Sequence, residues 1–363
     1  MKLIQSCHRN KLATISDICC SFVPHVWDYY LGLLYRYSWN KASRIFLALL
    51  ISLSCASMLQ GQQIKPKLTL IASGAVIDLV IDGNTLYTAT DQGKIDVFDI
   101  TSGSRINQIE VPSIHDFMGD EIPSKIYSID RTGDKLIMVV QGNHGFRNVL
   151  VFENGDLHKI IDADKDKLMI KKARFIDSNR IIYCSLSNEI TLYNIQLRQE
   201  VYKIPISAYS FSDFCLNETR SEIYTCDESG IIHRINVNNG ELLFDYSGNN
   251  VDNVYQVVFN NGILITGGQD RRVGIYNTVI DDKYYVEGDF LIYSVGLSPD
   301  GSIGAFSASE DNEVSLINTY TKEIFQMLKG HNSTITKIVF INNSTLITAC
   351  DDPNIFIWEI PGE

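Results

Sequence analysis

The sequence predicts an all-β fold, a seven-bladed β-propeller that is closed by pairing an N-terminal strand with the last blade. Three observations predict it: a strand-like segment recurs at a nearly fixed interval, further alternating runs accompany each copy, and the last copy lacks one strand that the start of the repeat region supplies. A repeat of about 40 residues is typical of propellers and solenoids.

The recurring segment ends on an aromatic or apolar residue. These ends lie at Phe98, Phe152, Tyr193, Ile235, Tyr276, Ile317 and Trp358. The intervals between them are 54, 41, 42, 41, 41 and 41 residues. Five of the six agree within one residue, which chance does not explain, and the long interval indicates an insertion in the second unit.

The sixth unit shows the strands most clearly. Residues 293–297 alternate between apolar and small or polar types, residues 298–301 (Ser-Pro-Asp-Gly) form a turn signal, and residues 303–306 return. Two further strand-like runs follow at 314–317 and 324–328. Alternating runs bounded by turn residues are typical of β-strands. Since no window after residue 60 shows sustained helical periodicity, the unit predicts a blade of four strands.

The last unit ends at Pro361 with only three strands, and residues 67–71 (Lys-Leu-Thr-Leu-Ile) supply a fourth before the first complete unit. Pairing the two ends would close the ring and remove an exposed sheet edge, which is an aggregation hazard. We therefore expect the propeller to span residues 64–361.

The N-terminal region predicts export. Lys41 and Arg44 precede an uncharged apolar run at 45–53, which is followed by small residues at 54–57. This order is typical of a secretory signal peptide, here 41–57, and the run is short of the roughly 20 residues that span a bilayer. Cleavage after Ala56 fits the small-residue pattern of a signal-peptidase site. Two alternatives stay open: an uncleaved membrane anchor and lipidation at Cys55. Residues 1–40 are an extension of doubtful start, explained by a start codon placed too far upstream.

The charge of the remaining chain excludes some partners. The whole chain has 31 basic and 43 acidic residues, and beyond residue 63 the formal charge is −16. A body this acidic is repelled by phosphate backbones and anionic lipid heads, so we expect no nucleic-acid partner. Membrane contact is expected only through the signal segment or a lipid anchor.

The final unit carries a family resemblance. Gly330-His331, residues 336–340, residues 346–352 and residues 355–359 resemble a WD40 repeat, with Trp358-Glu359 in place of Trp-Asp. The resemblance covers about 64–361, although the other six units lack the Trp and mostly lack Gly-His. It implies a seven-bladed propeller of the WD40 type. It also implies that His331, Thr348, Asp352 and Trp358 form the structural tetrad of one blade. A catalytic Ser/Thr-His-Asp arrangement uses the same residue types, but the resemblance places these side chains inside a blade.

Five segments are not generic WD40 sequence: 116–123, 145–149, 250–255, 268–274 and 288–293. Together they are similar to the NapL-type proteins, exported WD40-repeat accessories of bacterial periplasmic nitrate reductase gene clusters. The resemblance implies a periplasmic location and a part in nitrate metabolism.

Strand order predicts where these segments lie. When a blade's strands are lettered a to d outward, its d–a and b–c connections emerge on one face of the ring. Segments 113–124, 141–148, 249–253, 268–272 and 287–291 are such connections, so we expect all five to crowd one face around the channel mouth. Functional residues often lie in loops on a rigid scaffold. The candidate partner-binding residues are Asp116, Phe117, Met118, Asp120, Glu121, Phe146, Arg147, Asp252, Asp270, Arg271, Arg272 and Asp289.

The alternative for these residues is structural. Phe117 could pack onto its own blade, and Asp/Arg pairs could join the rims of neighbouring blades, Arg272 especially. An exposed aromatic beside Arg is, however, typical of an interface anchor.

Other chemistry finds little support in the sequence. The cysteines at 184, 215, 226 and 350 fit no metal-ligand spacing and predict buried apolar side chains, with a Cys215–Cys226 disulfide as an alternative. His115 and His144 share a loop face, which makes a weak metal site conceivable. We expect no metal and no cofactor.

The sequence thus favours a non-catalytic, monomeric, periplasmic protein-interaction scaffold, an accessory to nitrate reductase in assembly, maturation or electron transfer. Two alternatives stay open. One is a general envelope-assembly scaffold, with or without a lipid anchor. The other is a propeller enzyme that holds a ligand or metal in its central channel.

Overall fold

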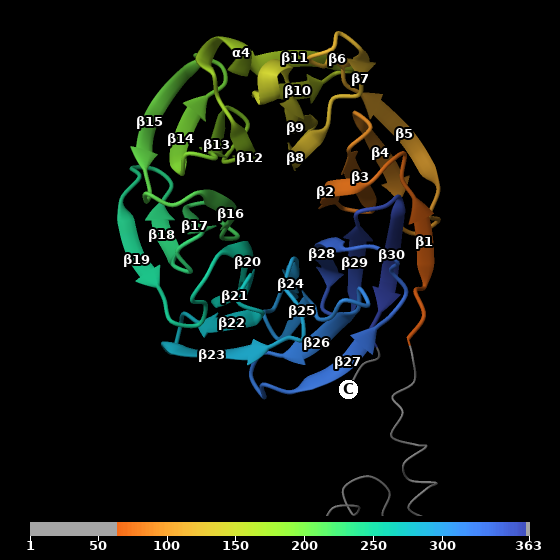
Figure 1. Cartoon of the computed structure of the whole chain (residues 1–363), viewed down its shortest axis with the longest axis vertical. Helices are drawn as coiled ribbons and strands as arrows, with labels where there is room; N and C mark the ends of the chain where they lie inside the picture. The colour runs from red at the N-terminus through yellow and green to blue at the C-terminus, as the bar shows by residue number, and fades with distance from the viewer. Residues whose placement is uncertain (1–63, 361–363) are drawn as a thin grey trace, which may run out of the picture. The chain divides into compact units, whose positions relative to one another are not determined.

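The computed structural model describes residues 64–360. The expected signal peptide, Cys55, the extension 1–40 and Pro361 lie outside the described residues. Within them, seven four-stranded antiparallel sheets surround a central channel (Figure 1). The predicted fold class, a closed seven-bladed β-propeller, is confirmed.

Each blade runs from an inner to an outer strand. Blade 1 is β2 (Val76–Asp82), β3 (Thr85–Thr90), β4 (Lys94–Asp99) and β5 (Arg105–Glu110); blade 2 is β8 (Ile126–Thr132), β9 (Lys135–Gln141), β10 (Arg147–Glu153) and β11 (Asp156–Ile161); blade 3 is β12 (Ile170–Phe175), β13 (Arg180–Ser185), β14 (Glu189–Asn194) and β15 (Gln199–Pro205); and blade 4 is β16 (Phe211–Leu216), β17 (Glu222–Asp227), β18 (Ile232–Asn236) and β19 (Leu242–Tyr246).

The remaining blades repeat the order. Blade 5 is β20 (Val254–Asn260), β21 (Ile263–Gly268), β22 (Arg272–Asn277) and β23 (Asp282–Glu287); blade 6 is β24 (Val295–Leu297), β25 (Ile303–Ser307), β26 (Val314–Asn318) and β27 (Ile324–Leu328); and blade 7 is β28 (Ile335–Asn342), β29 (Thr345–Cys350), β30 (Asn354–Glu359) and β1 (Leu68–Ile71). Three short elements lie in connections: the hairpin β6 (Ile114–His115) and β7 (Glu121–Ile122), the 3-10 turn η1 (Asn143–Gly145) and the helical turn α4 (Ala163–Asp166).

Blade 7 closes the ring as the sequence predicts. β1 pairs antiparallel with β30, with Leu68 opposite Ile357 and Ile71 opposite Asn354. The pairing is extended by backbone bonds from the Lys67 amide to the Ile357 carbonyl and from the Ala72 amide to the Pro353 carbonyl, each 2.8 Å. In Figure 1 the strand nearest the start of the described chain lies beside the strand nearest its end.

Burial explains the hydrophobic patterns. The two middle strands of a blade are sandwiched between neighbouring blades, so β9, β13 and β21 are buried on both faces and read as nearly continuous apolar runs. The outer strands are mostly exposed, as in β5 and β19. Seven apolar clusters fill the ring, and each joins two adjacent blades. Leu70 and Ile357 of blade 7, for example, pack with Leu86 and Phe98 of blade 1.

The inner strands carry a repeated polar residue that we call the channel position. Its occupants are Asp78, Ser128, Lys172, Asp213, Gln256, Ser294 and Lys337. In six of the seven blades the register of the inner strand shifts immediately before this residue, as at a β-bulge. A bulge turns a side chain out of the regular pleat.

The channel positions make contacts between blades. The Asp78 carboxylate accepts a bond from the Ile129 amide (3.0 Å), the Gln256 side-chain oxygen accepts one from the Val295 amide (3.1 Å), and Lys172 donates to the Phe214 carbonyl (2.6 Å). Asp78 also pairs with Arg174 at 3.0 Å and with Lys337 at 3.1 Å, so one buried carboxylate ties blade 1 to blades 3 and 7. These two cations hold the pKa of Asp78 well below its ordinary value despite its burial.

This network makes a stability prediction. Replacing Asp78 with Ala leaves Arg174 and Lys337 buried without their carboxylate, and we expect a loss of about 3 kcal/mol or more in the free energy of unfolding. The matched control is Asp82→Ala on the same strand, because Asp82 makes an exposed pair with Arg131; its cost should stay below about 1 kcal/mol. Urea denaturation of both variants tests this, and equal costs would contradict it.

Candidate interaction surface

The distinctive connections lie on one face of the ring. Backbone bonds join the d–a and b–c connections there: the Gln269 amide to the Asn253 carbonyl (2.8 Å), and the Gly288 amide to the Arg271 carbonyl (2.8 Å). The longest connection, 113–124, leaves the same face, since the Val111 amide before it bonds the Gly93 carbonyl of the b–c connection of blade 1 at 2.9 Å.

The insertion folds as the small hairpin β6–β7, and Asp116 fixes its tip. The Asp116 carboxylate accepts bonds from the Met118 amide (2.8 Å) and the Asp120 amide (2.9 Å), and its carbonyl accepts one from the Gly119 amide (3.1 Å). Gly119 has φ +90°, a conformation that suits glycine. Asp116, a candidate binding residue, therefore shapes the tip.

The tip presents apolar side chains to solvent. Phe117 is 96% exposed and Met118 is 72% exposed. Phe117 does not pack onto its own blade, so that alternative is wrong for this side chain. Asp120 and Glu121 are exposed beside it. A cleft of about 490 Å³ separates the hairpin from residues 141–145, and both His115 and His144 line it.

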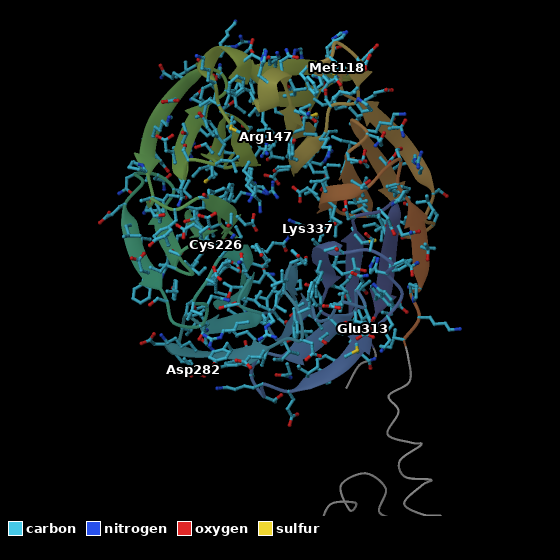
Figure 2. The ribbon with its side chains drawn as sticks, viewed as in Figure 1. Met118, Arg147, Cys226, Asp282, Glu313 and Lys337 are labelled. Carbon is cyan, nitrogen blue, oxygen red and sulfur yellow. The ribbon has the colours of Figure 1, made fainter. Side chains whose placement is uncertain are left out.

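The position of the hairpin differs from the expectation in one respect. Strand order predicts all five segments around the channel mouth, but β6, β7 and Met118 lie at the outer rim of the ring (Figures 1 and 2). The reason is that a d–a connection starts at an outer strand, here β5. The inserted residues form the hairpin close to that strand, before the chain turns inward to β8.

Two candidate arginines are engaged within the fold. The Arg147 guanidinium lies 3.8 Å from the centre of the Tyr127 ring and donates to the Ile170 carbonyl at 3.4 Å, and burial lowers its pKa. Arg272 lies 4.2 Å from the centre of the Tyr285 ring and donates to the Asn249 carbonyl at 3.3 Å. Both Arg272 contacts belong to blade 5 or its entry, so these contacts do not bridge blades.

The other candidates differ in exposure. Phe146 is half-buried, whereas Asp252, Arg271 and Asp289 are exposed at or near the face. None of these four lies in the hairpin, so the structure does not bring the candidate residues into a single cluster.

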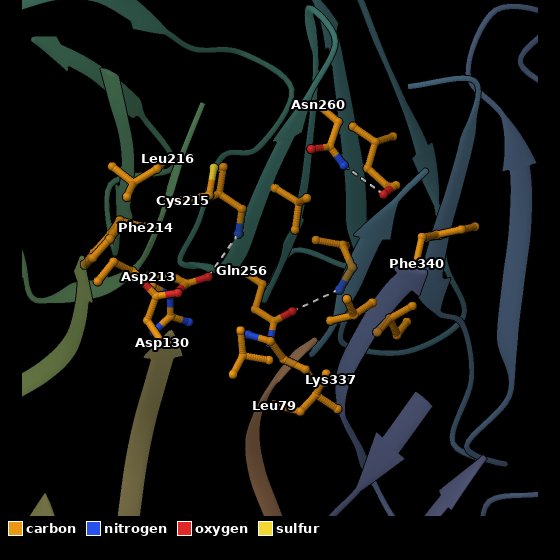
Figure 3. A pocket seen from close by; sticks show the side chains of 18 of the residues that line it. Leu79, Asp130, Asp213, Phe214, Cys215, Leu216, Gln256, Asn260, Lys337 and Phe340 are labelled. Carbon is orange, nitrogen blue, oxygen red and sulfur yellow. Dashed lines mark hydrogen bonds between the residues drawn. The ribbon is translucent and has the colours of Figure 1, made fainter. Parts of the chain in front are cut away.

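A ligand in the central channel is one of the alternatives that the sequence leaves open, but the sequence analysis names no residues for it. The structure has a cavity in this channel. Figure 3 shows residues that line this cavity, which measures about 580 Å³ and is bounded by inner strands and by a–b turns. Strand order puts the a–b turns on the face opposite the hairpin. The sequence does contain a signal for the channel: an apolar residue, any residue and then a polar residue begin six of the inner strands, as in Val76-Ile-Asp78 and Ile335-Thr-Lys337, and directly precede β24 in blade 6. A search for repeated His or carboxylates alone overlooks it.

Blade 7 holds a buried hydrogen-bonded relay. The Trp358 Nε1 donates to the Thr348 hydroxyl at 2.8 Å, and Thr348 lies 2.6 Å from His331 Nε2. His331 does not reach Asp352 directly: its Nδ1 is 3.0 Å from the Cys350 thiol, which donates to the Asp352 carboxylate at 3.1 Å. The four residues named from the sequence thus meet, with Cys350 inserted between two of them.

The comparisons with known proteins agree with this geometry. The family model described as "WD domain, G-beta repeat" matches residues 322–359, the part of the chain that holds the relay. The Cps50 (Swd1) β-propeller domain of Myceliophteria thermophila superposes with a TM-score of 0.69 over 82% of this chain and 100% of that domain, at 13% identity. The chain folds as a WD40-type propeller.

Two curated relatives are similar in sequence to this WD40 propeller. Actin-interacting protein 1 of Caenorhabditis elegans is 23% identical over 307 residues, which cover 77% of this chain and 45% of that protein. WD repeat-containing protein 62 of Mus musculus is 36% identical over 103 residues, 26% of this chain and 7% of that protein. The chain therefore spans less than half the length of either relative.

Blade 5 contains a degenerate copy of the WD40 tetrad. Thr266 donates to the Asn250 side-chain oxygen at 2.6 Å, and the Asn250 amide donates to Asp270 at 3.1 Å. Thr266, Asp270 and Tyr276 have the same spacing as Thr348, Asp352 and Trp358, with Asn250 in the place of His331. Asp270 also accepts the Val251 amide at 2.8 Å. This candidate binding residue is therefore held inside its blade.

The thiols of the WD40 propeller are free. Cys184, Cys226 and Cys350 are buried and Cys215 is half-buried, and burial raises the pKa of each. The alternative of a Cys215–Cys226 disulfide is wrong for this structure, because Cys215 lies opposite Tyr224 and Cys226 opposite Asp213. Among residues 64–360, no group of three His, Cys, Asp or Glu side chains could hold a metal ion, and no helix has the length and apolar character of a membrane span.

The tetrad predicts a pH dependence. Burial lowers the pKa of His331 from 6.5 to about 4. The folded state therefore binds fewer protons here than the unfolded state, so stability is complete above pH 6.5 and is lost as pH falls toward 4, by about 3 kcal/mol. His331→Asn, which copies blade 5, should remove this loss. Urea denaturation of both proteins between pH 7 and pH 4 tests it; parallel curves would contradict the assignment.

Proposed function

We propose that this protein is a non-catalytic interaction scaffold that captures a protein partner through the tip of the 113–124 hairpin. WD40 propellers generally mediate protein–protein interactions. The observation that carries the proposal is the adjacent exposure of Phe117 (96%) and Met118 (72%) on a tip held by Asp116.

The tip has the properties of an interface anchor. Aromatic residues that enter a pocket of the partner supply a large share of binding energy at protein interfaces. The bonds to Asp116 fix the tip before binding, which reduces the conformational entropy lost on association. Asp120 and Glu121 stand beside the anchor, and Glu121 accepts a bond from Ser113 in the same hairpin. A partner with an apolar pocket and a basic rim would complement this surface.

We further propose that the partner belongs to the periplasmic nitrate reductase system and that the protein is exported to the periplasm. Two sequence features support this: the five segments that resemble NapL-type proteins and the signal-like segment at 41–57. The contribution would be recognition during assembly, maturation or electron transfer. A general envelope-assembly scaffold is the second candidate, and the experiments below separate the two.

The hairpin is tested by photocrosslinking in cells. A benzophenone amino acid at position 117 should capture a specific partner, and Met118→Ser should reduce the yield severalfold, because the neighbouring apolar contact is lost. The matched control places the probe at Ile280, which is 69% exposed beside the 77% exposed Val279 in the β22–β23 turn. Equal capture of the same proteins at 117 and 280 would rule out the hairpin as the docking site.

The nitrate reductase assignment is tested by identifying the protein crosslinked at position 117. A subunit or maturation factor of periplasmic nitrate reductase is the expected product. Capture of an outer-membrane assembly component instead would replace the first candidate by the second. A fusion of residues 1–63 to a periplasm-dependent reporter should be active only outside the cytoplasm, and an inactive reporter would exclude export by this segment.

A further inference from the structure

The central cavity has two different walls. Toward its opening, half-buried apolar side chains of four inner strands line it: Val80, Ile81, Leu216, Val258, Val339 and Ile341. These lie in the C-terminal halves of β2, β16, β20 and β28 and at the end of β28, on the a–b side of the ring. Apolar walls with a few fixed polar groups and a volume of about 300–1,000 Å³ are typical of small-molecule sites, and this cavity measures about 580 Å³.

The cavity is also charged: four cations, Lys172, Arg174, Arg220 and Lys337, meet only three buried carboxylates, Asp78, Asp130 and Asp213. The other carboxylate in the lining, Glu218, is exposed in the a–b turn that follows β16. Lys172 pairs with Asp213 at 2.6 Å, and Arg220 pairs with Asp130 at 2.6 Å. Arg174 and Lys337, in contrast, share the single carboxylate of Asp78. Lys337 points into the channel in Figures 2 and 3.

One positive charge of this group therefore has no carboxylate of its own. The side chains of Lys337 and Arg174 are only 17% and 15% exposed, so water compensates the charge poorly. A small anion would compensate it, and this local excess lies within a chain whose remaining residues are strongly acidic.

We propose that the channel cavity binds a small amphiphilic anion of the fatty-carboxylate class, with its carboxylate beside Lys337 and Arg174 and its alkyl chain along the apolar wall. The site lies on the face opposite the hairpin and does not depend on the proposed protein partner. The positive charge of Lys337 and Arg174 selects the carboxylate head group, and the apolar wall selects the alkyl chain of the ligand.

Calorimetric titration of the full chain with decanoate, below its micelle concentration, tests the site. We expect saturable binding of one decanoate per chain. Decanol, which is neutral, and decyltrimethylammonium, which is cationic, should bind at least tenfold more weakly. Equal binding of the three would overturn the proposal, as would absence of decanoate binding.

Variants locate the ligand. Lys337→Gln should weaken decanoate binding at least tenfold, and Lys337→Arg should restore most of it. Leu216→Gln tests the apolar wall without touching the charged group and should also weaken binding at least tenfold. The matched control is Lys322→Gln on the outer rim, where Lys322 makes an exposed pair with Asp282. Thermal unfolding of each variant separates lost binding from lost folding; folded Lys337→Gln and Leu216→Gln proteins with unchanged affinity would overturn the assignment.

Discussion

Each blade buries both faces of its sheet only when a neighbour stands on either side, so the fold depends on closure of the ring. The junction between blades 7 and 1 requires β1 to pair with β30, because the last repeat brings only three strands. The pairing of β1 with β30 completes blade 7, and the apolar packing between blades 7 and 1 then closes the ring. At the centre, the channel positions add polar contacts between inner strands, and the buried Asp78 of blade 1 contacts blades 2, 3 and 7. Leaving such a carboxylate or its cations unpaired would be costly, which favours one register of the ring over others.

The same closure decides what is left for function. Because the middle strands are buried on both faces, the exposed surface consists of the outer strands, the connections and the channel. The hairpin at 113–124 is a long connection at the outer rim. The bonds from the Met118 and Asp120 amides to the Asp116 carboxylate fix its tip, where Phe117 and Met118 are exposed to solvent. The channel is the opposite case, since its lining belongs to the strands that hold the ring together. The two proposed sites therefore lie on opposite faces and can be altered independently.

Periodicity predicted the number of blades, the closing strand and the common face of the long connections, since these depend only on repeat spacing and strand order. Periodicity did not predict which polar side chains make hydrogen bonds or ring contacts within the fold. The sequence leaves open a structural role for the Asp and Arg residues, as pairs that join neighbouring blades. In the structure Arg272 contacts Tyr285, and Asp270 accepts a bond from Asn250, both within blade 5 or its entry. Arg147 stacks on the Tyr127 ring. The Cys350 thiol contacts both His331 and Asp352 and so joins the tetrad. Residue spacing in the sequence does not predict this contact. The radial position of the hairpin was also missed, because strand order fixes the face of a connection and not where along it the extra residues fold.

Hydrogen–deuterium exchange measures closure most directly. If β1 completes blade 7, the amides of residues 68–71 that bond to β30 exchange only when the whole propeller unfolds, with the same free energy as those of β29 and β30. The exposed hairpin tip should exchange much faster under the same conditions. Rapid exchange of 68–71 while the other blades stay protected would show that the ring does not depend on this strand, and would contradict the account.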